Sequence, residues 1–333
     1  MRNIVCFYHD KCADGLAAAA ALYNEMGNLT IEFIPSSYGD PLPDWVDEDL
    51  SDAQQRHYDE IFILDFSFPH DKLLELAKYT DSLVVLDHHK TAKDALTGEN
   101  KVYPRNVFIK FDMKKSGAQL AWDFFARGNQ DWWTRGVELV ADRDLWIWEY
   151  GENSKLFHQA VNIEIIQRDD WAPETKINKM LELLSQPKAA IERGKLYQPL
   201  WDLMVRDFAS RAIPNFAEVL RKDGPSSQII YTCWCPPMFS SDVGHAICDV
   251  HPEAVAMCLS HDVAAGGIKA SFRRSTNAED YVISAEVLAK RNLGGGGHKN
   301  AAGCFVSYDY IAVNHMEDFV LSFGQLKLQD AIL

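Results

Sequence analysis

The order of apolar and polar segments along the first 150 residues is typical of parallel β-α-β units. Short runs rich in β-branched and aromatic residues alternate with stretches in which apolar residues recur at helical spacing. Strands are predicted at 4–8, 31–35, 61–64 and 83–86, and helices at 15–26, 72–79 and 118–126. This alternation predicts an α/β fold with an N-terminal doubly wound parallel sheet.

The pattern changes further along the chain. Helical patterns continue over 132–145 and 175–208, with Pro187 and Pro199 inside the second stretch. A strong turn signal, Asp-Gly-Pro-Ser-Ser at 223–227, precedes segments of β character. These further strands are predicted at 228–232, 254–259, 268–273 and 304–307. We therefore expect an N-terminal domain over 1–185, a helical linker over 186–225 and a smaller C-terminal α/β domain over 226–333.

Three of the predicted strands end in acids or histidines. The first runs into His9-Asp10-Lys11-Cys12-Ala13-Asp14-Gly15, the third ends at Asp65, and the fourth runs into Asp87-His88-His89. The carboxyl ends of parallel strands face one crevice, so these residues are expected to meet in space. Asp142 and Asp144, within the later predicted helix at 132–145, lie where they could close the cluster.

So many acids beside histidines would repel one another unless a cation neutralised them. Oxygen donors mixed with imidazole suit manganese, magnesium or iron better than a thiolate-bound zinc. We therefore predict a divalent metal site. Asp65, alone at its strand end, is suited to bridging two ions about 3.5–4 Å apart, as in hydrolytic phosphoryl transfer.

A second group of interest is Gly294-Gly295-Gly296-Gly297-His298, followed by Ala301-Ala302-Gly303. Backbone N–H groups without side chains can approach a phosphate closely, although a glycine run alone is equally compatible with a surface turn. Arg273, at the end of a predicted strand, could add a guanidinium group. By contrast, Cys233-Trp234-Cys235 has no partner pair in the sequence, so we do not predict a zinc site there.

The charge and composition of the chain argue against several classes of binding partner. The chain has 33 Lys and Arg against 48 Asp and Glu, a formal net charge of −15. Without a basic stripe, binding to long duplex nucleic acid is not expected. No run approaches the roughly 18 apolar residues that cross a bilayer, so no membrane association is expected. The seven irregularly spaced cysteines and the absence of a signal-peptide pattern favour a cytoplasmic protein with free thiols.

Together these motifs resemble the DHH phosphoesterase family, in the subgroup with a DHH-associated C-terminal domain. That subgroup includes nano-RNases, bisphosphate phosphatases and proteins similar to exopolyphosphatases. The matching residues, in chain order, are His9, Asp14 and Gly15; Asp65; Asp87-His88-His89; Asp142; Ser271-Phe272-Arg273; and Gly294–His298 with Ala301-Ala302-Gly303.

The resemblance implies roles for these residues. One metal would be held by His9, Cys12 and Asp65, and the other by Asp14, Asp65, His88 and Asp142. His89 would contact the phosphoryl oxygen or protonate the leaving group, and Asp87 would orient a histidine. Arg273, Gly294, Gly295, Gly296, Gly297 and His298 would bind the substrate. The family usually has aspartate at the position of Cys12. This cysteine would ligate as a thiolate, leave a looser site or yield its place to Asp10.

The function implied is hydrolysis of phosphodiester bonds in short oligonucleotides or small nucleotides by a water activated between two divalent ions. Manganese is the expected metal, with magnesium or cobalt as substitutes. An exopolyphosphatase-type hydrolase is one alternative, and a nucleotide-binding regulator without catalysis is another. A homodimer is compatible with the sequence, which does not fix the oligomeric state.

Overall fold

The computed structural model describes residues 2–46, 56–98, 100–125, 134–221, 224–263, 265–293 and 295–309. The chain divides into two compact units, Met1–Gln198 and Pro199–Leu333. The boundary lies within α8 (Pro187–Ser210), in the segment that we expected to be a helical linker. None of the helices in the described ranges is both long and apolar enough to span a bilayer.

The first unit is built on a parallel sheet with the strand order β2-β1-β3-β4-β5. Its strands are β1 (Asn3–His9), β2 (Thr30–Ser36), β3 (Tyr58–Leu64), β4 (Thr80–Asp87) and β5 (Val107–Phe111). The doubly wound α/β fold and the four predicted strands are confirmed. β5 was not predicted, because it is a short edge strand with no fully buried residue and therefore lacks a clear apolar pattern.

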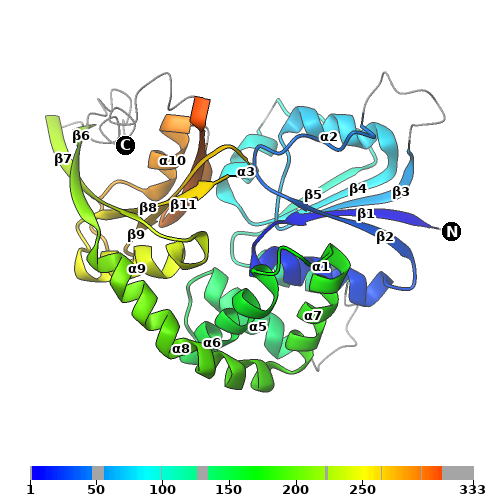
Figure 1. Cartoon of the computed structure of the whole chain (residues 1–333). Coiled ribbons are helices and arrows are strands. Elements are labelled where there is room, and N and C mark those ends of the chain that lie inside the picture. The colour runs from blue at the N-terminus through cyan, green and yellow to red at the C-terminus, as the bar shows by residue number, and fades with distance from the viewer. Residues whose placement is uncertain are drawn as a thin grey trace. The chain divides into compact units, whose positions relative to one another are not determined.

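Helices cover both faces of this sheet (Figure 1), with α1, α5, α6 and α7 on one face and α2 on the other. The helices of the unit, besides α8, are α1 (Ala13–Met26), α2 (His70–Leu76), α3 (Lys90–Leu96), α4 (Gly117–Phe125), α5 (Thr134–Asp144), α6 (Glu152–Val161) and α7 (Pro173–Ser185). A 3₁₀ turn, η1 (Ala77–Tyr79), follows α2, and a π-helical turn, η2 (Asn162–Ile166), follows α6. Residues 126, 132 and 133 of the predicted helices lie outside the described residues.

The period of two along the strands divides the core between the two faces. In β1, Ile4 and Cys6 belong to the cluster beneath α1, whereas Val5 and Phe7 belong to the cluster beneath α2. The alanine run 17–21 of α1 is buried against the first of these faces. Such small side chains let α1 pack closely against the sheet, α4 and α7.

The helix α4 begins with a capping box. The backbone N–H of Ser116 donates to Gln119 Oε1 at 3.2 Å, and the N–H of Gln119 donates to Ser116 Oγ at 3.3 Å. This reciprocal pair satisfies two N–H groups at the N-terminus of the helix. It fixes the end of α4 that lies at the site described below.

The second unit contains a mixed sheet with the strand order β10-β11-β9-β8-β7-β6. Its strands are β6 (Ile213–Arg221), β7 (Gly224–Trp234), β8 (Val255–Asp262), β9 (Gly267–Arg274), β10 (Gly296–His298) and β11 (Ala301–Ser307). Its other elements are η3 (Pro237–Phe239), α9 (Ser240–Val250) and α10 (Ala285–Leu293). β7 and β8 are parallel, and the other neighbouring pairs are antiparallel.

The turn signal at 223–227 has a different role from the one we expected. We placed the second domain after it, but β6 precedes it and pairs with β7 along its whole length. The signal therefore belongs to a hairpin inside the second sheet. Glycine and proline mark turns equally well within a domain and between domains, which explains the difference.

Candidate metal centre

The site lies at the carboxyl edge of the first sheet, where the strand order changes direction. β1 has β2 on one side and β3 on the other, so the connections that leave β1 and β3 run to opposite faces of the sheet. Ligands of open α/β sheets bind at such a point. His9 ends β1 and Asp65 follows β3, so the two residues flank this position.

Asp65 is buried, with 1% of its surface exposed, and its backbone is left-handed with a φ of 55°. Its N–H donates to Leu86 O at 2.9 Å, which holds it beside β4. His9 Nδ1 lies 3.5 Å from one carboxylate oxygen, and His88 Nε2 lies 3.1 Å from the other. Within the described ranges, neither oxygen accepts a well-aligned hydrogen bond. Burial opposes ionisation, but His88 and His9 outweigh it and hold the pKa of this carboxyl well below its usual range.

His88 is surrounded by carboxylates. Its Nε2 lies 3.1 Å from Asp65, 3.6 Å from Asp144 and 3.7 Å from Asp14. Burial disfavours the imidazolium, but the acids, with Asp65 first, prevail and raise the pKa of His88 to about 10. The position therefore favours positive charge, which a divalent cation would supply.

Asp14 connects this cluster to α4. Its carboxylate accepts hydrogen bonds from the N–H groups of Gly117 (2.5 Å) and Ala118 (3.0 Å), at the N-terminus of that helix. Asp65 packs against the same turn, because a Cβ on Gly117 would lie 2.3 Å from Asp65 Cβ. The start of α4 thus positions two of the predicted ligands.

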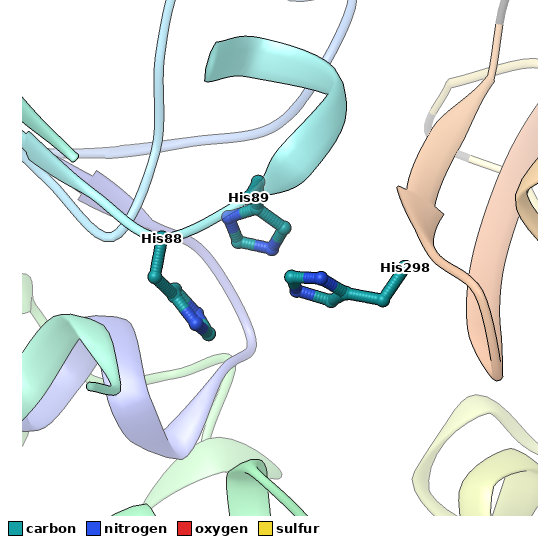
Figure 2. Close-up of side chains that lie close together, drawn as sticks. All are labelled: His88, His89 and His298. Carbon is teal, nitrogen blue, oxygen red and sulfur yellow. The ribbon is translucent and has the colours of Figure 1, made fainter. Parts of the chain in front are cut away.

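Asp87 is fully buried and organises the β4–α3 connection. It accepts hydrogen bonds from Ser67 Oγ at 2.6 Å and from the backbone N–H of His88 at 2.7 Å. It also contacts His89 Nδ1 at 2.7 Å. Burial alone would raise the pKa of Asp87, but His89 and Ser67 lower it, so the carboxylate stays ionised. The Nδ1 contact fixes the orientation of the His89 ring, and Figure 2 shows both histidines leaving this connection.

The donor atoms form two sets of three. The ligating atoms of Asp14, Asp65 and His88 lie within 4.8 Å of one another, and so do those of His9, Asp65 and His89. Asp65 belongs to both sets. Carboxylate oxygens and imidazole nitrogens gathered in this way fit divalent cations such as Mn²⁺ or Mg²⁺.

The structure separates Asp142 from this cluster and brings Asp144 into it. Asp142 accepts hydrogen bonds from the N–H groups of Glu149 (2.7 Å) and Tyr150 (3.1 Å) and from Ser154 Oγ, so both oxygens close the α5–α6 turn. Two residues along a helix differ by about 200°, so only one of the two aspartates can face His88. In this structure that residue is Asp144, and the predicted ligand Asp142 has a structural role.

Cys12 lies directly before α1 and is partly buried. Burial, followed by Asp65, Asp144 and Asp14, raises the pKa of its thiol well above the usual value. Asp10, the alternative ligand, has its N–H bonded to Ser36 O at 2.9 Å. Among the described residues, neither Cys12 nor Asp10 belongs to a set of three close donors.

Tyr38 was not predicted as a site residue. Its ring lies edge-on to His9 and His89, with centroid distances of 5.9 and 5.7 Å, and packs on Phe66 at 4.9 Å. With 48% of its surface exposed, the ring remains accessible. The signal was available, because Tyr38 follows β2 and therefore also ends a strand at the carboxyl edge.

The predicted substrate residues of the second unit have several roles. Gly294 lies outside the described residues, and Gly295 donates its N–H to Ala289 O at 3.1 Å. Gly296 to His298 form β10, so the run is partly a strand rather than an open loop. At Gly297 the φ of 142° and the close backbone of β11 both exclude a side chain. Figure 2 shows the His298 ring projecting from β10.

Arg273 and Arg274 differ in exposure and in hydrogen bonding. Arg274 is buried and donates hydrogen bonds to Val282 O, Ala278 O and Glu279 O, so it holds the segment before α10. Arg273 is partly exposed, and its Nη1 donates to Phe272 O at 2.8 Å. Of the two, Arg273 is the candidate for contact with a ligand.

No family model matches the chain. A protein of Acanthamoeba polyphaga mimivirus, uncharacterized protein R106, is 24% identical over 308 residues, which cover 90% of this chain and 66% of the viral protein. The chain thus spans about two thirds of that relative's length.

Two solved structures are similar over 97% of this chain. The pGpG-specific phosphodiesterase PggH from Vibrio cholerae is 13% identical, is covered over 99% of its length and has a TM-score of 0.50. Exonuclease RecJ bound to manganese is 18% identical, is covered over 88% of its length and has a TM-score of 0.49. The likeness to PggH shows the fold alone. The motifs at the ends of β1, β3 and β4 are the ones through which the sequence resembles the DHH phosphoesterase family.

Proposed function

We propose that this protein is a metal-dependent phosphoesterase that hydrolyses phosphodiester bonds in short oligonucleotides or small nucleotides. The observation that carries the proposal is the pair of donor sets that share Asp65 at the switch point of the sheet. A shared carboxylate suits two divalent ions, with manganese as the first choice. Asp14, Asp65, His88 and Asp144 would hold one ion, and His9 and Asp65 would bind the other, with His89 beside them for the substrate.

Bound ions would neutralise phosphate charge and acidify a water molecule. The protein's own groups would do the rest. Asp87 fixes the His89 ring, which would meet a phosphoryl oxygen or give a proton to the leaving group. Tyr38, beside both histidines, carries a phenol that could donate a hydrogen bond to the substrate.

The net charge of −15 supports a small substrate, because each additional phosphate would extend over an acidic protein. The similar Vibrio structure, a pGpG-specific phosphodiesterase, also supports a short nucleotide. We propose that Arg273 and His298 of the second unit bind the remaining phosphate of such a substrate.

The test is product analysis with Mn²⁺ on a panel of dinucleotides, 3′,5′-bisphosphorylated adenosine, cyclic dinucleotides and polyphosphate. We expect release of mononucleotides from dinucleotides by the wild type, and no turnover by Asp65→Ala. Gly98→Ala is the matched control, because a Cβ there meets nothing within 4 Å. Preference for polyphosphate over every nucleotide would favour the exopolyphosphatase alternative. Binding without turnover of any substrate would favour a regulator.

A further inference from the structure

Three buried cysteines of the second unit converge at one point of its sheet. Cys233 in β7 and Cys258 in β8 are directly opposite in the parallel register, and their Sγ atoms lie 3.8 Å apart. Cys235 follows β7, and the three sulfur atoms lie within 4.8 Å of one another. All three are free thiols, with exposed fractions of 4%, 6% and 1% in chain order.

The alternation of the strands explains why these sulfurs share one face. Ile230, Met257 and Leu259 belong to the apolar cluster beneath α10. Cys233 and Cys258 are offset from them by an odd number of residues, so they lie on the opposite face, which α9 covers. The N–H of Cys235 donates to Leu259 O at 3.0 Å and keeps the chain against β8 beyond the end of β7.

The helix that covers this face, α9, has a glycine close to Cys258. A Cβ on Gly244 of α9 would lie 3.7 Å from Cys258 Sγ and 2.6 Å from Arg273 Cγ. Cys258 and the aliphatic part of Arg273 therefore lie beneath the same part of α9. Anything that fixes β7, β8 and α9 together there also fixes the strand face that carries Arg273.

The spacing fits a metal ion. Thiolates bind zinc at about 2.3 Å, and the tetrahedral angle then places two sulfurs about 3.8 Å apart. The Cys233–Cys258 separation of 3.8 Å has this value. Thiolate donors select zinc or monovalent copper over the harder cations that suit carboxylates. We propose that Cys233, Cys235 and Cys258 form a three-thiolate site for a thiophilic metal ion, zinc in the first place.

This site would be independent of the metal centre in the first unit. Its donors are sulfur, whereas that centre offers carboxylate oxygen and imidazole nitrogen. The two would therefore differ in metal preference and in spectrum. Cys233 and Cys235 have no partner pair close to them in the sequence. The sheet supplies that partner, Cys258, from a strand 25 residues away.

The test loads the full-length chain with Co²⁺ alone, after chelation under reducing conditions, and records the near-ultraviolet band of thiolate-to-cobalt charge transfer. The Asp65→Ala background removes the site of the first unit, so the remaining binding reports on the cysteines. We expect one equivalent of Co²⁺ to develop the band in this background. Cys258→Ala and Cys235→Ser, each added to it, should abolish the band.

Cys304→Ser is the matched control, because Cys304 is a buried thiol of the same unit outside the cluster. It should keep the band, and zinc should raise the Tm of this variant but not that of Cys258→Ala or Cys235→Ser. A chain that binds Co²⁺ without the band would overturn the proposal, as would a band that survives both cluster variants. The readout does not depend on phosphoesterase activity, so failure of either proposal would be recognised separately.

Discussion

Gly117→Ala is a substitution for which helix propensity and packing predict opposite effects. Gly117 is the first residue of α4, and replacing glycine by alanine in helical backbone ordinarily stabilises a protein by about 0.4–1 kcal/mol. Here the added Cβ would lie 2.3 Å from Asp65 Cβ and 2.5 Å from Asp65 Oδ1. Non-bonded carbon atoms prefer about 3.5–4.0 Å, so Asp65 or the start of α4 must move by more than 1 Å.

The expected cost follows from these contacts. Overpacking a well-packed site costs about 1–3 kcal/mol, which exceeds the gain in propensity, so a net loss of about 1–2 kcal/mol is expected. The displaced residue belongs to both donor sets. The N–H of Gly117 also binds Asp14, so both ligands shift together. We expect manganese affinity to fall by at least about tenfold, equivalent to about 1.4 kcal/mol.

Urea unfolding of the metal-free protein and calorimetric titration with Mn²⁺ measure the two effects. Gly98→Ala, in the same unit and without close neighbours, should change neither quantity. If Gly117→Ala is more stable than the wild type and binds Mn²⁺ equally well, α4 does not pack as closely on Asp65 as described above. Loss of stability with unchanged affinity would contradict the positioning of Asp65 by this helix.

Five further results are expected. Asp142→Ala should lower the free energy of unfolding by about 2–4 kcal/mol, because three donors lose their acceptor. Asp144→Ala should instead weaken Mn²⁺ binding in a folded protein, and the reverse pattern in calorimetry would restore Asp142 as the ligand. Cys12→Asp should keep or raise manganese-dependent activity, because oxygen suits this cation better than sulfur, and a dead variant would identify a required thiolate. Tyr38→Phe should lower turnover of dinucleotides while the histidines keep their metal, and unchanged kcat and KM would exclude its hydroxyl from the reaction. Specific activity should be highest on dimers to tetramers, and equal rates on long strands would contradict the repulsion argument.

The sequence predicted the position of the metal centre because parallel strands impose a simple geometry. Polar residues directly after β1, β3 and β4 must meet at one edge, whatever the lengths of the connections between them. His9, Asp65 and His88 are therefore accessible to pattern analysis. The same rule applied to β2 would have found Tyr38.

Other features depend on information that a linear pattern does not contain. The choice between Asp142 and Asp144 depends on how α5 is rotated about its axis, which packing decides. The same turn residues are found in a hairpin, such as the one between β6 and β7, and at a domain boundary, such as the one that we expected. Their presence alone does not distinguish the two. Cys258 joins Cys233 only through the register of β7 and β8, which is a long-range property.

At Asp65 the backbone and the side chain have opposite consequences. The left-handed backbone lowers the stability of the protein, and the carboxylate belongs to both donor sets of the metal centre. A φ of 55° is unfavourable for a residue with a Cβ, by roughly 1–2 kcal/mol, and glycine would adopt it freely. Glycine here would relax the chain and remove the carboxylate common to both donor sets. Variants selected for heat resistance alone should therefore accumulate this change and lose metal with it. Stabilisation of the protein for practical use must exclude Asp65 from the positions that are allowed to vary.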